Sequence, residues 1–210
     1  MCGRYAITKA VKKTKSIVQN VKGVEDTDNF NAYPTQLLPI IKKDQDSLSL
    51  SNYHWGLIPK WSEKMQDFKP LNNARLETLM KKKTFSGLIG KQRCVVPADG
   101  YYEWRKNDEG KKFPQFIKRE HNETLFFTGL YQKNNNIEFS IITTEAKGQL
   151  AYIHHRMPVI LKEEEINNYL NAQDPIVFLN SHQNPDLVFY EVSRDVNNPS
   201  NNHPGLLDPA

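Results

Sequence analysis

The chain has 210 residues and a formal net charge of +4, the difference between 28 basic and 24 acidic residues. This length accommodates one sizeable hydrophobic core, so we expect a single domain over residues 1–210. The sequence contains no apolar run near the roughly 18 residues of a membrane span, and no charged and apolar leader opens it. We therefore expect a cytoplasmic protein with no membrane partner.

The positions of the cysteines and lysines bear on whether the protein uses disulfides, a metal or a nucleic-acid partner. Cys2 and Cys94 are too few for a disulfide framework, and no second Cys/His cluster completes a zinc site, so we expect no metal and no cofactor. Cys94 lies in an apolar strand-like run, which indicates a small buried hydrophobe. Lysines crowd residues 9–22 and 81–91. A lysine-rich surface of this kind could bind a nucleic-acid phosphate backbone, and it is equally typical of an ordinary solvated surface.

The first half of the chain predicts mixed local structure. The expected elements are a strand over 2–8, a helix over 9–18, a turn-rich loop over 29–34, strands over 36–42 and 48–57, an irregular stretch over 58–73 and a helix over 74–83. The second half is dominated by short β-rich runs separated by turns. They lie at 93–96, 100–105, 113–119, 125–131 and 137–143, followed by a helix over 163–171, a strand over 187–192 and an irregular Asn/Pro-rich tail over 197–210.

This spacing of strands favours antiparallel pairing over a parallel α/β sheet. We therefore predict an α+β fold, a β-rich single domain whose antiparallel strands form a barrel-like or sandwich core flanked by short helices.

The N-terminal residues carry the sharpest chemical signal. Removal of Met1, which the small second residue permits, leaves Cys2 with an α-amine and a thiol on adjacent carbons. Such a 1,2-aminothiol condenses with an aldehyde, first through the amine as a Schiff base and then through the thiol as a five-membered thiazolidine. The alternative is a cysteine that merely follows the start codon.

Two further segments place polar groups where a β core has no need of them. Asn73 and Arg75 follow each other closely, and a helix cap explains only one asparagine there. Glu103 follows the turn at 97–100 and belongs to an alternating strand. It either faces solvent or points inward among aromatic side chains, where desolvation would raise its pKa and suit it to proton transfer.

A fourth segment contains His154, His155 and Arg156 in succession. Histidine is the usual proton carrier near neutral pH, and the adjacent arginine can hold a phosphate. Neighbours in a strand point to opposite faces, so we do not expect the two histidines to share a metal ion.

Five motifs in this order closely resemble the SRAP family (SOS response-associated peptidase). They are Cys2-Gly3-Arg4-Tyr5, the run from Trp55 to Trp61, the run from Asn73 to Thr78, the run from Arg93 to Trp104, and His154-His155-Arg156-Met157-Pro158. Together they span nearly the whole chain, and it is their combination, rather than any single motif, that is specific for the family. The resemblance implies a monomer, associated with the nucleoid through DNA, that senses and shields abasic sites in single-stranded DNA. Mature Cys2 would attack the C1′ aldehyde of the abasic sugar and end as a thiazolidine crosslink.

The resemblance also implies individual roles. Asn73 would orient the N-terminal amine and the sugar. Glu103 would act as acid and base in opening the sugar, in releasing Met1 and in reversing the crosslink. His154 would transfer protons at the Schiff base and on the leaving 3′ phosphate side, which adds possible lyase and autoproteolytic activities. The implied DNA contacts are Arg4, Asn31, Trp61, Arg75, Lys83, Thr143 and Arg156.

Three positions depart from the family pattern. Ser62 follows Trp61 where some relatives have a second tryptophan. Lys83 stands where an arginine can occur, which keeps the charge and loses the bidentate fork. His155 occupies a position that is often acidic, which bears on how His154 is tuned.

Two other function classes fit part of the sequence. An N-terminal-nucleophile amidohydrolase or self-processing peptidase would use the Cys2 thiol against an amide, with its own amine as base. That class favours an αββα sandwich. A plain single-stranded DNA-binding module would bind reversibly and with salt sensitivity, whether or not a base is missing.

Overall fold

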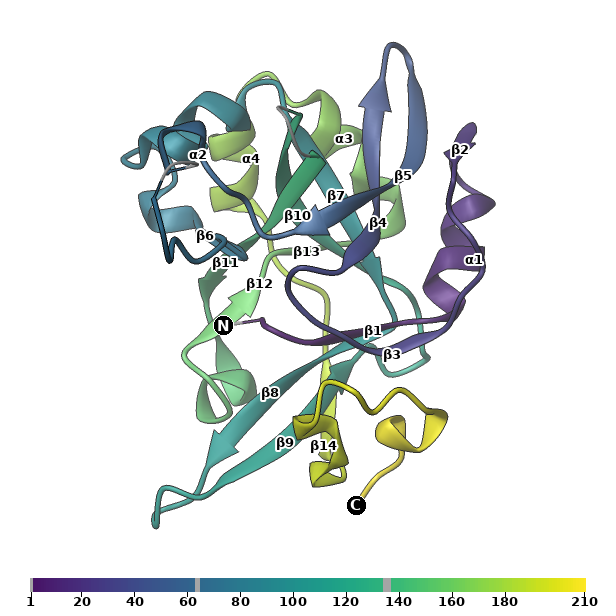
Figure 1. The fold of residues 1–210 in the computed structure, drawn as a ribbon, viewed down its shortest axis with the longest axis vertical. Coiled ribbons are helices and arrows are strands. Elements are labelled where there is room, and N and C mark those ends of the chain that lie inside the picture. The colour runs from purple at the N-terminus through teal and green to yellow at the C-terminus, as the bar shows by residue number, and fades with distance from the viewer. Residues whose placement is uncertain (1, 63–64, 134–136) are drawn as a thin grey trace.

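Two β-sheets and a few short helices make up the fold (Figure 1). The computed structural model describes residues 2–62, 65–133 and 137–210. The smaller sheet is antiparallel throughout. In spatial order its strands are β14 (Val188–Glu191), β9 (Lys112–Lys118), β8 (Gly100–Lys106), β1 (Tyr5–Ile7) and β3 (Asn29–Ala32).

The larger sheet closes on itself. Its main path is β12 (Arg156–Pro158), β11 (Ile137–Glu145), β10 (Leu125–Lys133), β7 (Arg93–Ala98), β4 (Leu37–Asp44), β5 (Ser47–Trp55) and β2 (Asn20–Lys22), with β6 (Asn73–Arg75) beside β11 and β13 (Ile160–Leu161) beside β10. Because β5 also pairs with β11, the strands β11, β10, β7, β4 and β5 form a closed ring. The predicted barrel-like, β-rich fold is confirmed.

Aromatic rings fill the core between the two sheets. Trp55 stacks on Phe139 with ring centroids 6.3 Å apart, and Tyr5 from β1 lies 5.1 Å from the Trp55 ring. The Tyr5 ring also meets Phe127 edge-on at 5.9 Å. All four side chains are completely buried. The first strand of the chain is therefore fixed by the packing of the barrel.

Short helices cover the outside of the barrel. The α-helices are α1 (Lys9–Lys15), α2 (Lys83–Ile89), α3 (Ile166–Asn171) and α4 (Pro175–Ser181). The 3-10 turns are η1 (Lys60–Ser62), η2 (Leu76–Thr78), η3 (Gly148–Tyr152), η4 (Glu163–Glu165), η5 (Arg194–Asn197) and η6 (Pro204–Leu207). Among the described residues, none of these helices has the length and apolar character needed to span a bilayer.

Two predicted elements are wrong. The segment 74–83, expected as a helix, begins in strand β6, because Asn73, Ala74 and Arg75 pair in parallel with β11. Pairing with a distant strand outweighs the helical preference of this stretch. The segment 29–34, expected as a loop, contains strand β3, which pairs with β1 through Ala32 and Asn29.

Helix α4 was absent from the predicted elements although its sequence carries a start signal. Asp174 is the N-cap, and its Oδ1 accepts hydrogen bonds from the backbone N–H groups of Ile176 and Val177, both at 3.0 Å. Pro175 occupies the first turn. An acidic cap followed by proline is a known helix beginning.

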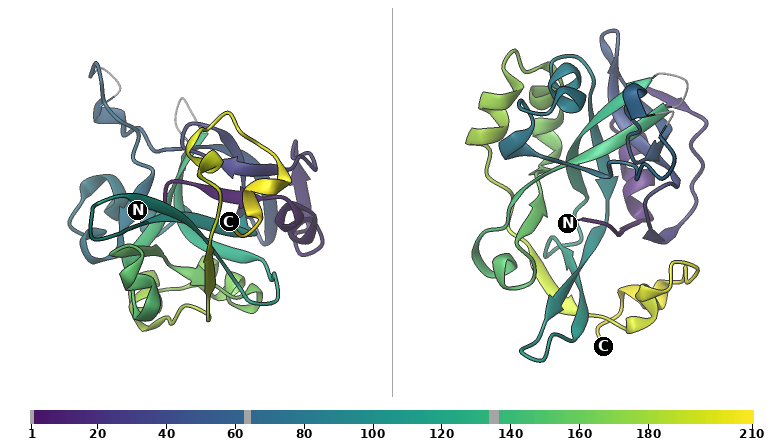
Figure 2. Two further views of the ribbon diagram at one scale, coloured as in Figure 1. Left: turned by 90° about the horizontal axis from the view of Figure 1, so that it is seen from below. Right: turned by 60° about the vertical axis from the view of Figure 1, so that its left-hand side comes forward.

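The C-terminal tail is irregular apart from η5 and η6, but it packs closely. Val196 and Leu206 are completely buried, and Asn31 Nδ2 donates to the carbonyls of Val196, Asn198 and Asn201 at 3.0–3.2 Å. The tail thereby returns to β3 and lies against the smaller sheet (Figure 2).

Asp99 connects the first strand to the smaller sheet. It lies between β7 and β8, and its carboxylate accepts from the Thr8 backbone N–H, from the Thr8 hydroxyl at 2.9 Å and from the Ala10 N–H at 2.9 Å. These bonds satisfy free N–H groups in the first turn of α1, just after β1. Asp99 thus holds the β1–α1 junction beside the start of β8.

We expect Asp99→Ala to lower the free energy of unfolding by about 1–2 kcal/mol, because buried N–H donors in the first turn of α1 lose their acceptor. Urea denaturation monitored by circular dichroism measures this change. Asp46→Ala is the matched control, since the Asp46 side chain is fully solvated and its ion pair with Lys43 is 3.8 Å long. Equal stability of the two variants would contradict the prediction.

Candidate active site at the N-terminal cysteine

Cys2 lies three residues before Tyr5, the first residue of β1, and is completely buried. Asn73 Nδ2 donates a hydrogen bond to the Cys2 carbonyl at 2.9 Å. Two residues after Cys2, the Arg4 carbonyl accepts a hydrogen bond from the Tyr102 N–H at 2.9 Å. The segment from Cys2 to Arg4 is therefore held from two sides, by β6 and by β8.

Glu103 lies next to this N-terminal segment. Tyr5 pairs with Tyr101 and Ala6 with Gly100, so the antiparallel register continues toward Glu103 opposite the residues just after Cys2. Glu103 is only 4% exposed, and burial raises the pKa of its carboxyl group. The inward-facing alternative is the one observed. Burial also raises the pKa of the Cys2 thiol well above its usual range, and the negative charge of Glu103 adds to that shift.

His154 faces Glu103 from the other side, with 3.8 Å between its Nδ1 and Glu103 Oε1. The backbone of Arg156 holds the same Nδ1, with its N–H at 3.0 Å and its carbonyl oxygen at 3.3 Å. Burial first, and then positive charges that include Arg156, lower the pKa of His154 to about 4. At neutral pH His154 is an uncharged base.

Strand β6 presents Asn73 and Arg75 on the same face, because alternate residues of a strand point the same way. Asn73 Oδ1 is buried and has no hydrogen-bond partner among the described residues, while its Nδ2 holds Cys2. Arg75 is exposed and makes no ion pair within the described part of the chain. Beside Cys2, β6 thus offers a free acceptor and a free cation.

Arg4 and Asn31, two of the predicted DNA contacts, are bonded to each other. Arg4 Nη1 donates to Asn31 Oδ1 at 2.7 Å and to the Val196 carbonyl at 2.9 Å. The guanidinium also lies over the Tyr33 ring, 5.7 Å from its centroid. Asn31 is 1% exposed. This pair joins β3 and the C-terminal tail to the residues that follow Cys2.

Arg156 is buried and already bound to an anion. Its Nη1 and Nη2 contact the two oxygens of Glu77 at 3.0 and 2.9 Å, and Nη2 donates to the Thr143 carbonyl at 2.7 Å. The Thr143 hydroxyl, completely buried, accepts from the same nitrogen at 3.2 Å. These bonds fix the backbone of Arg156, whose N–H orients His154.

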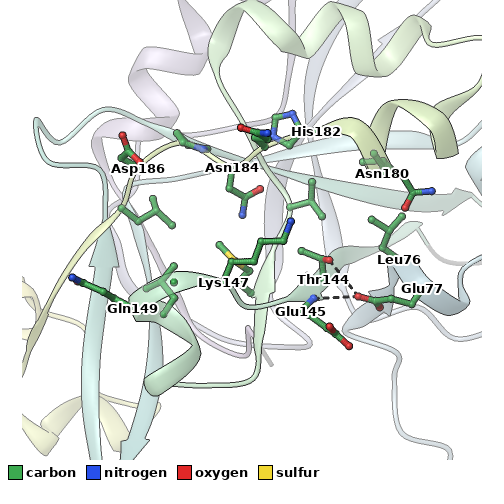
Figure 3. A pocket seen from close by; sticks show the side chains of 18 residues that line it. Leu76, Glu77, Thr144, Glu145, Lys147, Gln149, Asn180, His182, Asn184 and Asp186 are labelled. Carbon is green, nitrogen blue, oxygen red and sulfur yellow. Dashed lines mark hydrogen bonds between the residues drawn. The ribbon is translucent and has the colours of Figure 1, made fainter.

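Glu77 had no predicted role, although it lies within the motif from Asn73 to Thr78. Figure 3 shows it at the edge of a cavity of about 720 Å3, where it accepts from the Thr144 hydroxyl and the Glu145 N–H. The lining of this cavity includes none of Cys2, Asn73, Glu103 and His154. The sequence signal that could have indicated a role for Glu77 is its position, as an acidic residue, inside the motif from Asn73 to Thr78.

Trp61 and Lys83 lie near each other. The Trp61 side chain is 64% exposed, and its Nε1 donates to the hydroxyl of Thr84, the residue after Lys83, at 3.4 Å. The ring meets Phe68 edge-on at 5.5 Å. Ser62 is buried, with its hydroxyl donating to the Pro59 carbonyl. One aromatic surface and one exposed cation are therefore available here.

The expectation that His154 and His155 point to opposite faces is wrong. Both precede β12 and follow η3, so strand alternation does not apply to them. Their rings lie 4.3 Å apart with an interplanar angle of 31°. His155 thus packs against the ring that faces Glu103.

The fold and site together define a β-barrel protein with a buried N-terminal thiol beside an acid and a base. The family model described as SOS response associated peptidase (SRAP) matches residues 1–199. The chain is 34% identical to the abasic site processing protein YoqW of Bacillus subtilis over 99% of both chains. It is 29% identical to the abasic site processing protein HMCES of Rattus norvegicus, covering 87% of this chain and 65% of that protein. A solved protein structure from Bacteroides thetaiotaomicron superposes with a TM-score of 0.82, at 28% identity and full coverage of both chains. This chain belongs to the SRAP family.

We expect the pKa of His154 to be about 4, and NMR titration of its ring measures this directly. As pH falls from about 6.5 to about 4, His154 becomes protonated in the unfolded chain but stays neutral in the folded protein. The free energy of unfolding should therefore decrease over this range. His154→Gln should weaken this decrease. A His154 ring that titrates near 6.5 would overturn the assignment.

Proposed function

We propose that this protein processes abasic sites in single-stranded DNA by forming a covalent crosslink through Cys2 after Met1 has been removed. The observation that carries the proposal is the convergence of Cys2, Glu103 and His154, with Asn73 bonded to the Cys2 carbonyl at 2.9 Å. The names of the curated relatives support the abasic site as substrate.

The chemistry requires a free amine before a thiol. Removal of Met1 converts the Cys2 amide nitrogen into an α-amine, which adds to the C1′ aldehyde of the opened abasic sugar. Loss of one water gives a Schiff base, and addition of the thiol to the imine carbon closes a thiazolidine. The balance is aldehyde plus aminothiol giving the ring and one water, with no oxidant or cofactor.

The surrounding groups suit these proton transfers. Asn73 Oδ1, a buried acceptor with no partner among the described residues, can orient the new α-amine. Glu103 holds its proton more tightly than an exposed glutamate, which fits it to protonate the leaving hydroxyl. Its carboxylate then accepts the thiol proton, since the two groups are close enough to influence each other's charge. Neutral His154 supplies a second proton acceptor.

Exposed side chains near the site are suited to binding single-stranded DNA. Trp61 offers a stacking surface, and Arg75 and Lys83 are exposed cations. Base stacking and phosphate contacts of this kind bind single strands with little regard to sequence. The proposal assigns these contacts to one domain over residues 1–210 acting as a monomer.

The amidohydrolase alternative is less well supported. It favours an αββα sandwich, whereas the described residues form a closed barrel and a second sheet. A buried thiol with a raised pKa is also a poor first nucleophile toward an amide. In the crosslinking reaction the amine attacks first, so the thiol need not be ionised at the start.

We expect the wild-type protein to give a heat-stable, slower band with abasic single-stranded DNA on a denaturing gel, and Cys2→Ala to give none. Intact mass should equal protein lacking Met1 plus DNA minus one water. Cys94→Ala is the matched control, because Cys94 is buried in β7 away from the proposed reaction and should leave the band in place. An equal band from Cys2→Ala, or an unmodified protein that turns over an amide, would sink the proposal.

The two arginines near the site should behave differently. Arg75→Gln should weaken DNA binding and reduce the salt slope of affinity by about 0.7, the value for one phosphate on a single strand, without changing the melting temperature. Arg156→Gln should lower the free energy of unfolding by about 1–3 kcal/mol, because Glu77 and the Thr143 carbonyl lose a buried partner. Salt-dependent binding and urea denaturation separate these effects, and identical behaviour of the two variants would contradict the distinction.

A further inference from the structure

A hollow lies beside the candidate active site, and most of its lining residues have no role in the chemistry described above. It has a volume of about 490 Å3 and lies between the β8–β9 hairpin and η3. Glu103 and His154 belong to its lining, so it opens directly onto the proposed reaction centre. The other lining residues are Trp104, Lys106, Lys112, Ala151, Tyr152, Ile153 and His155.

Tyr152 presents an aromatic ring at the edge of this hollow. Its side chain is 84% exposed, the most exposed large hydrophobic side chain in the described part of the chain. The backbone beneath it is firm, because the N–H groups of Ile153 and His154 both donate to the Leu150 carbonyl, at 3.0 and 3.1 Å. The ring contributes nothing to the core, yet it is fixed two residues before His154. It is well placed to stack on a ligand.

Two lysines of the hairpin, Lys106 and Lys112, belong to the lining of the same hollow. Lys106 and Lys112 are directly opposed partners in the β8–β9 ladder. Like charges in this arrangement destabilise a sheet, and neither lysine forms an ion pair with any described residue, unlike Arg105, which lies 3.8 Å from Glu191. Two unneutralised cations beside an exposed ring match the phosphate and the base of a nucleotide.

We propose that this hollow binds a nucleotide that flanks the abasic site in the same DNA strand. Tyr152 stacks on its base, and Lys106 and Lys112 contact its phosphate. The inference rests on the proposed function, because the strand whose sugar reaches Cys2 must pass the hollow that Glu103 and His154 line.

Tyr152 and Trp61 then bind opposite sides of the lesion. Figure 1 shows the start of β1 between the blue segment of η1 and α2 on one side and the green η3 turn with the β8–β9 hairpin on the other. The right-hand view in Figure 2 shows the same order. Ser62 is buried and supplies no ring beside Trp61. The second stacking surface of this chain is therefore Tyr152, across the reaction centre.

The test uses DNA that extends from the lesion in one direction only. Two short single strands carry a tetrahydrofuran abasic analogue, which has no aldehyde, either at the 5′ end or at the 3′ end. Fluorescence anisotropy measures the affinity of each for wild type, Tyr152→Ala, Tyr152→Phe and Trp61→Ala. Because no crosslink can form, this result is independent of whether wild type crosslinks natural abasic DNA.

We expect Tyr152→Ala to weaken binding of one of the two strands by roughly 5- to 150-fold, the range for loss of one stacked base. Trp61→Ala should weaken the other strand, and Tyr152→Phe should retain wild-type affinity for both. Lys106→Gln combined with Lys112→Gln should weaken the same strand as Tyr152→Ala and reduce its salt slope by about 1.4, twice the value for one phosphate.

Two control variants match these changes. Val177→Ala removes another exposed apolar side chain, 62% exposed on α4, and Lys9→Gln with Lys12→Gln removes two exposed cations on α1. Both should leave affinity for the 5′ and 3′ strands at the wild-type value. Unchanged or equally reduced binding of the two strands by Tyr152→Ala, or reduction of the same strand by the Tyr152 and Trp61 variants, would overturn the inference. Failure of wild type to crosslink would instead overturn the proposed function alone.

Discussion

The pairing of β1 with β8 is the constraint on which the rest of the site depends. Tyr5 opposite Tyr101, together with the hydrogen bond from the Tyr102 N–H to the Arg4 carbonyl, aligns the beginning of the chain with Glu103. A terminus normally frays unless it is tied down. Here the Tyr5 ring is packed in the aromatic core, which anchors the short segment from Cys2 to Arg4 that precedes β1.

Burial gives the three titratable groups of the site complementary properties. It raises the pKa of Glu103, raises that of the Cys2 thiol and lowers that of His154. All three shifts have the same leading cause, since a poorly solvated site disfavours whichever form carries the charge. The outcome is a carboxyl group that releases its proton less readily than an exposed glutamate and a histidine that is uncharged at neutral pH, with 3.8 Å between Glu103 Oε1 and His154 Nδ1. Groups whose pKa values are pushed in opposite directions are suited to acid–base work.

Sequence reasoning found what local patterns encode and missed what long-range pairing decides. The short β-rich runs after Arg93 were readable because strand alternation is local, and the barrel followed from their spacing. Strand β6 was not readable, because its partner β11 lies far along the chain and its own residues favour a helix. The same limit applies within the site. The motifs named Cys2, Glu103 and His154, but the bond between Glu77 and Arg156 joins residues 79 positions apart and has no local signature.

The raised pKa of Cys2 suggests an order of events that also protects the thiol. A protonated, buried thiol reacts slowly with oxidants and with stray electrophiles, because the thiolate is the reactive form. The proposed first step avoids this barrier by using the amine. Once the Schiff base has formed, the thiol sits on the adjacent carbon, and intramolecular attack at high effective concentration compensates for its low ionised fraction. In the proposed mechanism the thiol therefore becomes reactive only toward the aldehyde that the amine has already captured, which would confine the covalent step to the bound lesion.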